Sequence, residues 1–341
     1  MVNSSVNILL QLLRLALGNK VERATYLDLD WREAISLSFE QEVAALAVDG
    51  LQKLYEENPG LKLDIDKPEL EPLKYQWFGS TIKAEENYKR VVAAAKALAQ
   101  KCPIVVLKGM AIARKYPEPS HRASGDLDVF GYGGALEFTQ CDISAKYIIY
   151  SDYKHFGFLF HGVLVEYHKC LIAWKSLKKG IIIEKTLQDA IGIPNDIFAN
   201  DYFNALFLAV HSYLHFMLED GISLKHICDW WVAGIGILPD VEQQRLLKAV
   251  EQFGMKEFVA SITHVAKYVC DNPSTELTET EWRMLDDVLS LGRKRRFKNG
   301  HLNMVYHILF YNGWKFKVYA DESNIVCLLK CVWNAISKRN L

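Results

Sequence analysis

The sequence lacks the features that mark secreted and membrane-embedded proteins. Its seven cysteines are an odd number and form no Cys-x-x-Cys pair, which favours buried thiols in a reducing compartment. The N-terminus has neither the basic region nor the cleavage site of a signal peptide. No stretch reaches the roughly 18 uninterrupted apolar residues that suggest a membrane span. We therefore expect a cytoplasmic protein without a membrane span.

An excess of charge of either sign is missing as well. The formal net charge is −1, so the composition argues against a nucleic-acid partner. Internal repeats and low-complexity tracts are also absent. What is present is an ordinary globular balance, with 50% hydrophobic and 24% charged residues. Because 341 residues exceed the size at which single cores usually stop growing, we expect two or three packed subdomains.

Helical patterns enclose one region of strand patterns, which predicts an α+β fold with a small mixed β-sheet. The predicted divisions are an N-terminal helical region (1–74), an α/β core (75–172) and a C-terminal helical domain (173–341). Helices are expected at 4–17, 31–57, 73–101, 109–115, 134–145, 198–219, 223–235, 240–270 and 277–292, with two more near the end. Strands are expected at 103–107, 126–130, 147–151, 153–160 and 163–168, and the last two are joined by a two-residue turn, His161-Gly162.

Asp126 and Asp128 form the most informative pattern in the chain. Residues i and i+2 of a strand point to the same face, so the two carboxylates converge. Like charges this close repel unless a cation lies between them, and hard oxygen ligands suit Mg²⁺ or Mn²⁺. Glu166 repeats this logic on a later strand. If the two strands are neighbours, three carboxylates meet and can hold two metal ions, the arrangement used for in-line displacement at phosphorus.

The residues upstream strengthen a pattern that is weak alone, since D-x-D pairs are usually solvated turn residues and a strand glutamate usually faces water. Lys108 adds a positive charge, and Gly109 lets backbone approach a phosphate at the start of a helix. Arg122 lies four residues before Asp126, a spacing compatible with a triphosphate contact. Each also has a plainer interpretation: Lys108 on the surface, Gly109 in a turn, and Arg122 neutralising Asp126.

The segment 107–130 resembles the signature of an uncharacterised bacterial nucleotidyltransferase family of the polymerase-β-like superfamily. That signature is a strand ending in Leu-Lys-Gly, a short helix, a Tyr-Pro-x-Pro turn, an Arg, and Gly-Asp-hydrophobic-Asp. The matching elements here are Leu107–Gly109, Tyr116–Pro119, Arg122 and Gly125–Asp128. Val165–His168 is similar to the segment that carries the superfamily's third carboxylate. The superfamily normally has Gly-Ser or Gly-Gly in its phosphate turn, where this chain has Lys108-Gly109.

This resemblance implies transfer of a nucleoside monophosphate from an NTP to an acceptor hydroxyl, with release of pyrophosphate. Asp126, Asp128 and Glu166 would be the catalytic residues and would hold the metal, two Mg²⁺ or Mn²⁺ ions. Glu166 would also assist deprotonation of the acceptor. The residues implied to bind the nucleotide are Lys108, Gly109, Arg122 and Gly125. The acceptor, a small molecule or a protein side chain, is not identified by the sequence.

Four further residues are candidates for the acceptor side: His168, His211, His215 and Asp229. His211 and His215 resemble paired histidines of the family, with Asp229 as its later aspartate. Their i, i+4 spacing places them on one helical face, where they line the acceptor cleft, have a structural role or bind zinc. Asp229 is expected to pair with one of them. A basic run at 293–298 is interpreted as a solvated helix end or as a phosphate or RNA contact.

Three functions stay open from the sequence. The leading one is a metal-dependent nucleotidyltransferase. The second is a catalytically silent protein of the same fold, which binds a nucleotide or acts as an antitoxin-like partner; retention of all three carboxylates argues against it. The third is a relative that modifies nucleic acid, against which the near-neutral charge argues.

Overall fold

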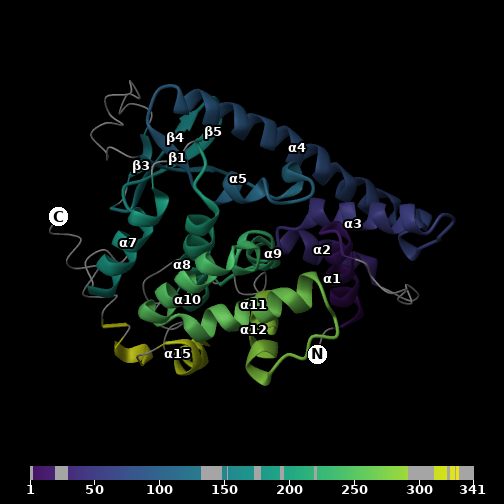
Figure 1. Ribbon diagram of the computed structural model, residues 1–341. Coiled ribbons are helices and arrows are strands. Elements are labelled where there is room, and N and C mark those ends of the chain that lie inside the picture. The colour runs from purple at the N-terminus through teal and green to yellow at the C-terminus, as the bar shows by residue number, and fades with distance from the viewer. Residues whose placement is uncertain are drawn as a thin grey trace.

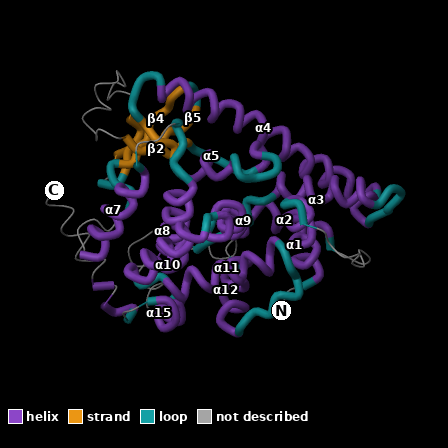
Figure 2. The backbone as a smooth tube through the Cα atoms, in the orientation of Figure 1, coloured by secondary structure: helices purple, strands orange, loops and turns teal. Residues whose placement is uncertain are grey.

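The computed structural model describes residues 3–19, 30–131, 148–151, 153–172, 178–192, 196–218, 221–290, 311–320, 323–326 and 328–329. Within them the chain has the predicted α+β architecture, in which helices surround one small sheet (Figures 1 and 2). The predicted helix at 134–145 and the basic run at 293–298 lie outside these residues. The four described cysteines are buried free thiols, as expected: Cys102, Cys170, Cys228 and Cys270.

The chain opens with three helices, because the segment predicted as one long second helix forms two. Helix α1 (Ser4–Ala16) begins after Asn3, whose side chain accepts a hydrogen bond from the Val6 amide at 2.9 Å. The predicted single helix at 31–57 is wrong, because Glu42 adopts a positive φ of 60° that an α-helix does not tolerate. The segment forms α2 (Trp31–Glu40) and α3 (Ala44–Glu57) instead.

A five-stranded mixed sheet is the centre of the α/β part, with strand order β1-β2-β5-β4-β3. The strands are β1 (Ile104–Val106), β2 (Leu127–Gly131), β3 (Ile148–Ser151), β4 (His155–Phe160) and β5 (Val163–His168). Strands β2 and β5 run parallel, and the other neighbours are antiparallel. The predicted turn between β4 and β5 is confirmed: His161 and Gly162 both have positive φ, as a two-residue hairpin turn with matching twist requires.

Helix α4 (Glu71–Ala99) connects the two hydrophobic cores of the molecule. Its first half contributes Trp77 to the core formed by the helices, and its second half places Val91 and Leu98 against the sheet. Figure 1 shows this long helix passing from the N-terminal helices to the strands. Two short 3-10 turns, η1 (Asp64–Asp66) and η2 (Pro68–Leu70), precede it where a loop was expected.

The rest of the described chain is helical, as predicted, with two corrections. Helix α7 (Lys178–Ile191) was not predicted, and the expected helix at 240–270 is broken at Gly254, whose φ of 73° ends α10. The other elements are α5 (Lys108–Ala113), η3 (Pro119–His121), α8 (Asp201–Leu218), α9 (Leu224–Ala233), η5 (Ile235–Ile237), α10 (Asp240–Phe253), α11 (Lys256–Cys270), α12 (Glu279–Leu289) and α15 (Gly313–Tyr319). One core joins these helices to α1 and α3, and the division at 74 and 172 stays a prediction.

Candidate active site

The register of two strands brings the predicted carboxylates together. Asp128 in β2 pairs directly with Glu166 in the parallel strand β5, so the two side chains leave the same face of the sheet. Asp126 immediately precedes β2, two residues before Asp128. The condition on which the sequence argument depended, that the two strands are neighbours, is met.

Asp128 is the most buried of these carboxylates, at 2% exposure. Its Oδ1 lies 3.1 Å from the Lys108 Nζ and 2.9 Å from the His168 Nε2. Burial raises the pKa of Asp128, but Lys108 and the hydrogen bond from His168 outweigh burial and hold that pKa well below its usual range. Because the carboxylate is ionised, His168 donates through Nε2. The second oxygen, Oδ2, is buried without a hydrogen-bond partner.

Asp126 has the opposite electrostatic environment. Burial and the neighbouring charge of Asp128 raise the pKa of Asp126 to about 6, with a further contribution from Glu166; Lys108 and Lys225 oppose the rise. A cation that binds beside such a carboxylate would stabilise its ionised form.

Side chains of β3 and β4 contact Glu166. The Tyr150 hydroxyl donates to Glu166 Oε1, and the Nε2 of His155 lies 3.8 Å from Oε2. Burial and this carboxylate raise the pKa of Tyr150, so the phenol stays protonated and keeps donating. Tyr150 was not predicted as part of the site, because the strand pairing of β3 with β4 that places it there is not visible in local sequence patterns.

The donor set fits a divalent cation. Asp128, Glu166 and His168 each offer one ligand atom, and these atoms lie within 4.8 Å of one another. The buried, unpartnered Oδ2 of Asp128 is an oxygen that a hard cation would satisfy. Asp126, which was predicted as a ligand, is not in this group of three, which has His168 as its third member.

The Lys108-Gly109 turn has an unusual backbone. Lys108 and Gly109 have φ values of 24° and 27°, a region that glycine tolerates and that strains lysine. The preceding amide, of Leu107, donates to the Asp128 carbonyl at 2.9 Å, which ties the turn to β2. A Cβ on Gly109 would lie 3.7 Å from the Ser124 Oγ and 3.9 Å from the Arg122 Nη1. The turn thus places Lys108 directly beside Asp128.

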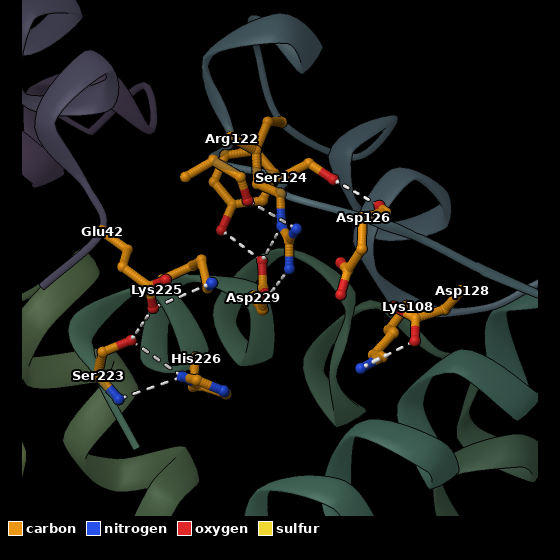
Figure 3. A network of polar contacts seen from close by, with 12 residues as sticks. Glu42, Lys108, Arg122, Ser124, Asp126, Asp128, Ser223, Lys225, His226 and Asp229 are labelled. Atoms are coloured by element: carbon orange, nitrogen blue, oxygen red, sulfur yellow. Dashed lines mark hydrogen bonds and ion pairs between the residues drawn. The ribbon is translucent and has the colours of Figure 1, made fainter. Parts of the chain in front are cut away.

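The interpretation in which Arg122 neutralises Asp126 is wrong, because Arg122 pairs with a different carboxylate. Its guanidinium donates to both oxygens of Asp229 in α9, from Nε at 3.0 Å and from Nη2 at 2.7 Å. The Tyr116 hydroxyl donates to the same carboxylate at 2.8 Å. Burial lowers the pKa of Arg122, and Asp229 raises it by more, so the net shift is upward. The expectation that Asp229 pairs with a histidine is therefore wrong, since its hydrogen-bond donors are Tyr116 and Arg122. Figure 3 shows Arg122 against Asp229.

His211 and His215 lie beside a third imidazole, His226 of α9. The ring centroids of His211 and His215 are 4.3 Å apart, and those of His215 and His226 are 5.9 Å apart. Burial lowers the pKa of His211 and of His226 well below the usual value, so both rings are neutral at pH 7. The Ser223 amide donates to the Nδ1 of His226 at 3.1 Å. Within the described residues these three rings do not form a group with metal-ligand spacing.

Two further charged residues belong to this neighbourhood and were not predicted. Lys225, in the first turn of α9, forms an ion pair with Glu42 at 3.0 Å (Figure 3). Burial and the charge of Arg122 lower the pKa of Lys225. Glu42 comes from the break between α2 and α3, and only that break, absent from the predicted helix, places it here.

The comparison with protein-family models identifies the chain. Residues 28–271 match a family described as uncharacterised nucleotidyltransferase. The chain belongs to this family. The match spans the described strands of the sheet, Lys108, Arg122 and all three carboxylates, so the candidate site of this nucleotidyltransferase lies within the matched region. The search of curated proteins found no match, and neither did the search of solved structures. Among the described helices, none combines the length and apolar character needed to cross a membrane.

Proposed function

We propose that this protein is a metal-dependent nucleotidyltransferase that moves a nucleoside monophosphate from an NTP, such as ATP, to an acceptor hydroxyl. The observation that carries this proposal is the pairing of Asp128 with Glu166 across parallel strands, with Asp126 two residues before. Three carboxylates and one lysine at a single point of a sheet suit the handling of a triphosphate with its divalent cations.

Each residue has a separate role in this proposal. Asp128 and Glu166, together with Asp126, would hold the metal, and His168 fixes Asp128 through the hydrogen bond at 2.9 Å. Lys108, whose Nζ lies 3.1 Å from the Asp128 Oδ1, would offer its positive charge to the phosphates. The bound metal would supply charge neutralisation on the triphosphate and polarise the α-phosphorus.

The proposed reaction is a displacement at the α-phosphorus of the NTP. The acceptor oxygen forms a bond to the α-phosphorus, and the bond between that phosphorus and the oxygen bridging to the β-phosphorus breaks. Pyrophosphate leaves with the bonding electrons, and the acceptor hydroxyl loses its proton to Glu166. His155, 3.8 Å from the Glu166 Oε2, is placed to take part in passing that proton to solvent. Orientation and charge stabilisation supply the rest of the rate enhancement.

A second candidate is a protein that binds nucleotide without catalysis. The internal pairing of the site favours it to some degree: Asp128 is neutralised by Lys108, and Glu166 is held by Tyr150. This candidate shares metal and nucleotide binding with the first one and differs from it only in turnover.

The test is calorimetric titration with each NTP in the presence of Mg²⁺ or Mn²⁺. We expect metal-dependent binding by the wild type and none by the Asp126→Asn, Asp128→Asn double variant. The chain offers a matched control in a second D-x-D pair, Asp64 and Asp66, which lies in η1 at the protein surface and binds Lys67 and Lys74. The Asp64→Asn, Asp66→Asn variant should bind like the wild type. A wild type that binds no nucleotide with either metal removes the proposal. Nucleotide binding without release of pyrophosphate in the presence of any acceptor tested favours the second candidate.

A further inference from the structure

The loop that leads into β2 is fastened by a side chain from the opposite, helical half of the molecule. Asp229 in α9 is 2% exposed and receives three hydrogen bonds, two from Arg122 and one from Tyr116. All three donors reach it from the segment between α5 and β2. A bidentate arginine–carboxylate pair in a buried setting fixes orientation as well as distance.

Arg122 transmits this anchoring to the residues beside the carboxylates. Its Nη1 donates to the Ala123 carbonyl at 2.8 Å. The Ser124 hydroxyl in turn donates to the Asp126 carbonyl at 3.3 Å. Asn87 of α4 donates to the Ser124 carbonyl from the other side. Ala123 and Ser124, which lie between Arg122 and Asp126 in the chain, are thus each held by a hydrogen bond, and Figure 3 shows the bond from Ser124 to Asp126.

The same guanidinium also lies against the Lys108-Gly109 turn. Its Nη1 would be 3.9 Å from a Cβ on Gly109, and the Ser124 Oγ would be 3.7 Å from it. A Cβ at these distances would make ordinary van der Waals contact, so the positive φ of 27° is what favours glycine at this position. The position of Arg122 therefore affects both the turn that carries Lys108 and the start of the strand that carries Asp128.

The helix that supplies Asp229 is itself anchored at its N-terminus. Gln41, fully buried between α2 and α3, accepts a hydrogen bond from the Leu224 amide at 2.9 Å and donates to the Val288 carbonyl at 3.0 Å. Glu42 adds the ion pair with Lys225. Helix α9 is thus fixed to the N-terminal helices and to α12 before it meets Arg122, which makes it a rigid support.

We infer that Asp229 is a positioning residue for the metal site, acting through Arg122 on the Lys108-Gly109 turn and on Asp126. This inference rests on the proposed function, because it assigns the site's geometry to a residue of the helical half. It also replaces the expected roles of both residues: Arg122 supports the loop instead of contacting the triphosphate, and Asp229 supports Arg122 instead of contacting the acceptor.

The experiment measures Mn²⁺ binding by electron paramagnetic resonance, with thermal unfolding recorded for every variant. In the Asp229→Asn variant the affinity for Mn²⁺ should fall by about 10-fold or more, as is typical when the support of a metal ligand is lost. The milder Arg122→Lys variant, which keeps a charge beside Asp229 but cannot bridge to Ala123, should lose affinity in the same direction.

A second buried ion pair supplies the control. Lys315 and Asp287 are 2.8 Å apart and buried among the C-terminal helices, remote from the carboxylates in sequence and fold. The Asp287→Asn variant should lose thermal stability comparably to Asp229→Asn, since each leaves a buried cation without its partner, and should bind Mn²⁺ as the wild type does. Equal Mn²⁺ affinity of Asp229→Asn and the wild type would overturn the inference while leaving the proposed function intact.

A double variant separates positioning from stability. Replacing both partners, as Arg122→Met with Asp229→Leu, removes the buried charges together and should recover thermal stability. We expect Mn²⁺ affinity to stay low in this variant, and full recovery of affinity would show a structural role only. If the wild type binds no Mn²⁺ even with an NTP present, the proposed function fails and this inference fails with it.

Discussion

Glu166 lies directly beside Asp128 in the register of two parallel strands, β5 and β2. The two residues are separated by 38 positions in the chain, and the pairing of the strands alone brings them to one point. His168, two residues beyond Glu166, leaves the same face and bonds Asp128. Three groups able to bind a cation thus meet because the strands pair in this register and in no other.

Removing the charge of Glu166 should weaken metal binding without disturbing the fold. In Glu166→Gln the side chain keeps its shape and an oxygen that accepts from Tyr150. Loss of a unit charge next to a divalent cation should reduce Mn²⁺ affinity by at least about 10-fold, measured by electron paramagnetic resonance. The control is Glu184→Gln, since Glu184 is buried and accepts from the Leu171 and Ile172 amides. That variant should lose stability and keep its Mn²⁺ affinity; the reverse pattern would contradict the assignment of Glu166.

Asp126 should destabilise the metal-free protein at neutral pH. Its folded pKa is about 6, above the unfolded value near 4. When the pKa of an acid is higher in the folded than in the unfolded protein, the free energy of unfolding is unaffected below the unfolded pKa. It falls as the pH rises from the unfolded pKa to the folded pKa. In chelator, Asp126→Asn should therefore be more stable than the wild type by on the order of 2 kcal/mol at pH 8, with the gain vanishing near pH 4. Denaturant unfolding at both pH values tests this, and a variant that is less stable at pH 8 would refute it.

The D-x-D pattern shows how far the sequence alone could lead. It occurs at 28–30, 64–66 and 126–128, and each described copy does something different. Asp30 accepts from the Glu33 amide as a helix cap, whereas Asp66 binds Lys74 and Tyr55 at the surface. Local pattern could not separate these cases. The third copy was singled out by the upstream Lys108-Gly109 and by a family resemblance that the family match confirms.

What the sequence did not predict depends on long-range packing. The strands of the sheet were predicted nearly to the residue because alternating apolar patterns and turn residues are local signals. The partner of Arg122 was not predicted, since Asp229 lies 107 residues away in the chain. Similarly, the break at Glu42 has no glycine or proline to mark it, and only the observed φ of 60° reveals it.

The buried histidines should make the protein less stable in mild acid. The folded pKa values of His211 and His226 lie well below the unfolded value of about 6.5. Because these pKa values are lower in the folded protein, their contribution to stability is fully present above the unfolded pKa. It is lost as the pH falls below the unfolded pKa, because the unfolded chain binds protons there and the folded chain does not. His211→Phe, which can stack on Phe207 as the imidazole does, should reduce the slope of unfolding free energy against pH by about 1.4 kcal/mol per unit between pH 6 and 5. If denaturant titrations give the same slope for the variant and the wild type, residues other than His211 take up the proton.

Gly50 permits a close backbone contact between α3 and α1, and its replacement should strongly destabilise the protein. A Cβ on Gly50 would lie 1.9 Å from the Leu12 carbonyl oxygen, so α1 and α3 cannot keep their spacing in Gly50→Ala. Both sides of this contact are backbone within helices, which leaves no side chain to move aside. We expect a loss of about 3 kcal/mol or more, in line with overpacked cores. Gly79→Ala in α4 is the control: no atom lies within 4 Å of its added Cβ, and alanine should stabilise that helix by up to about 1 kcal/mol. If the two substitutions have equal effects on thermal unfolding, the packing of α1 on α3 is looser than this contact implies.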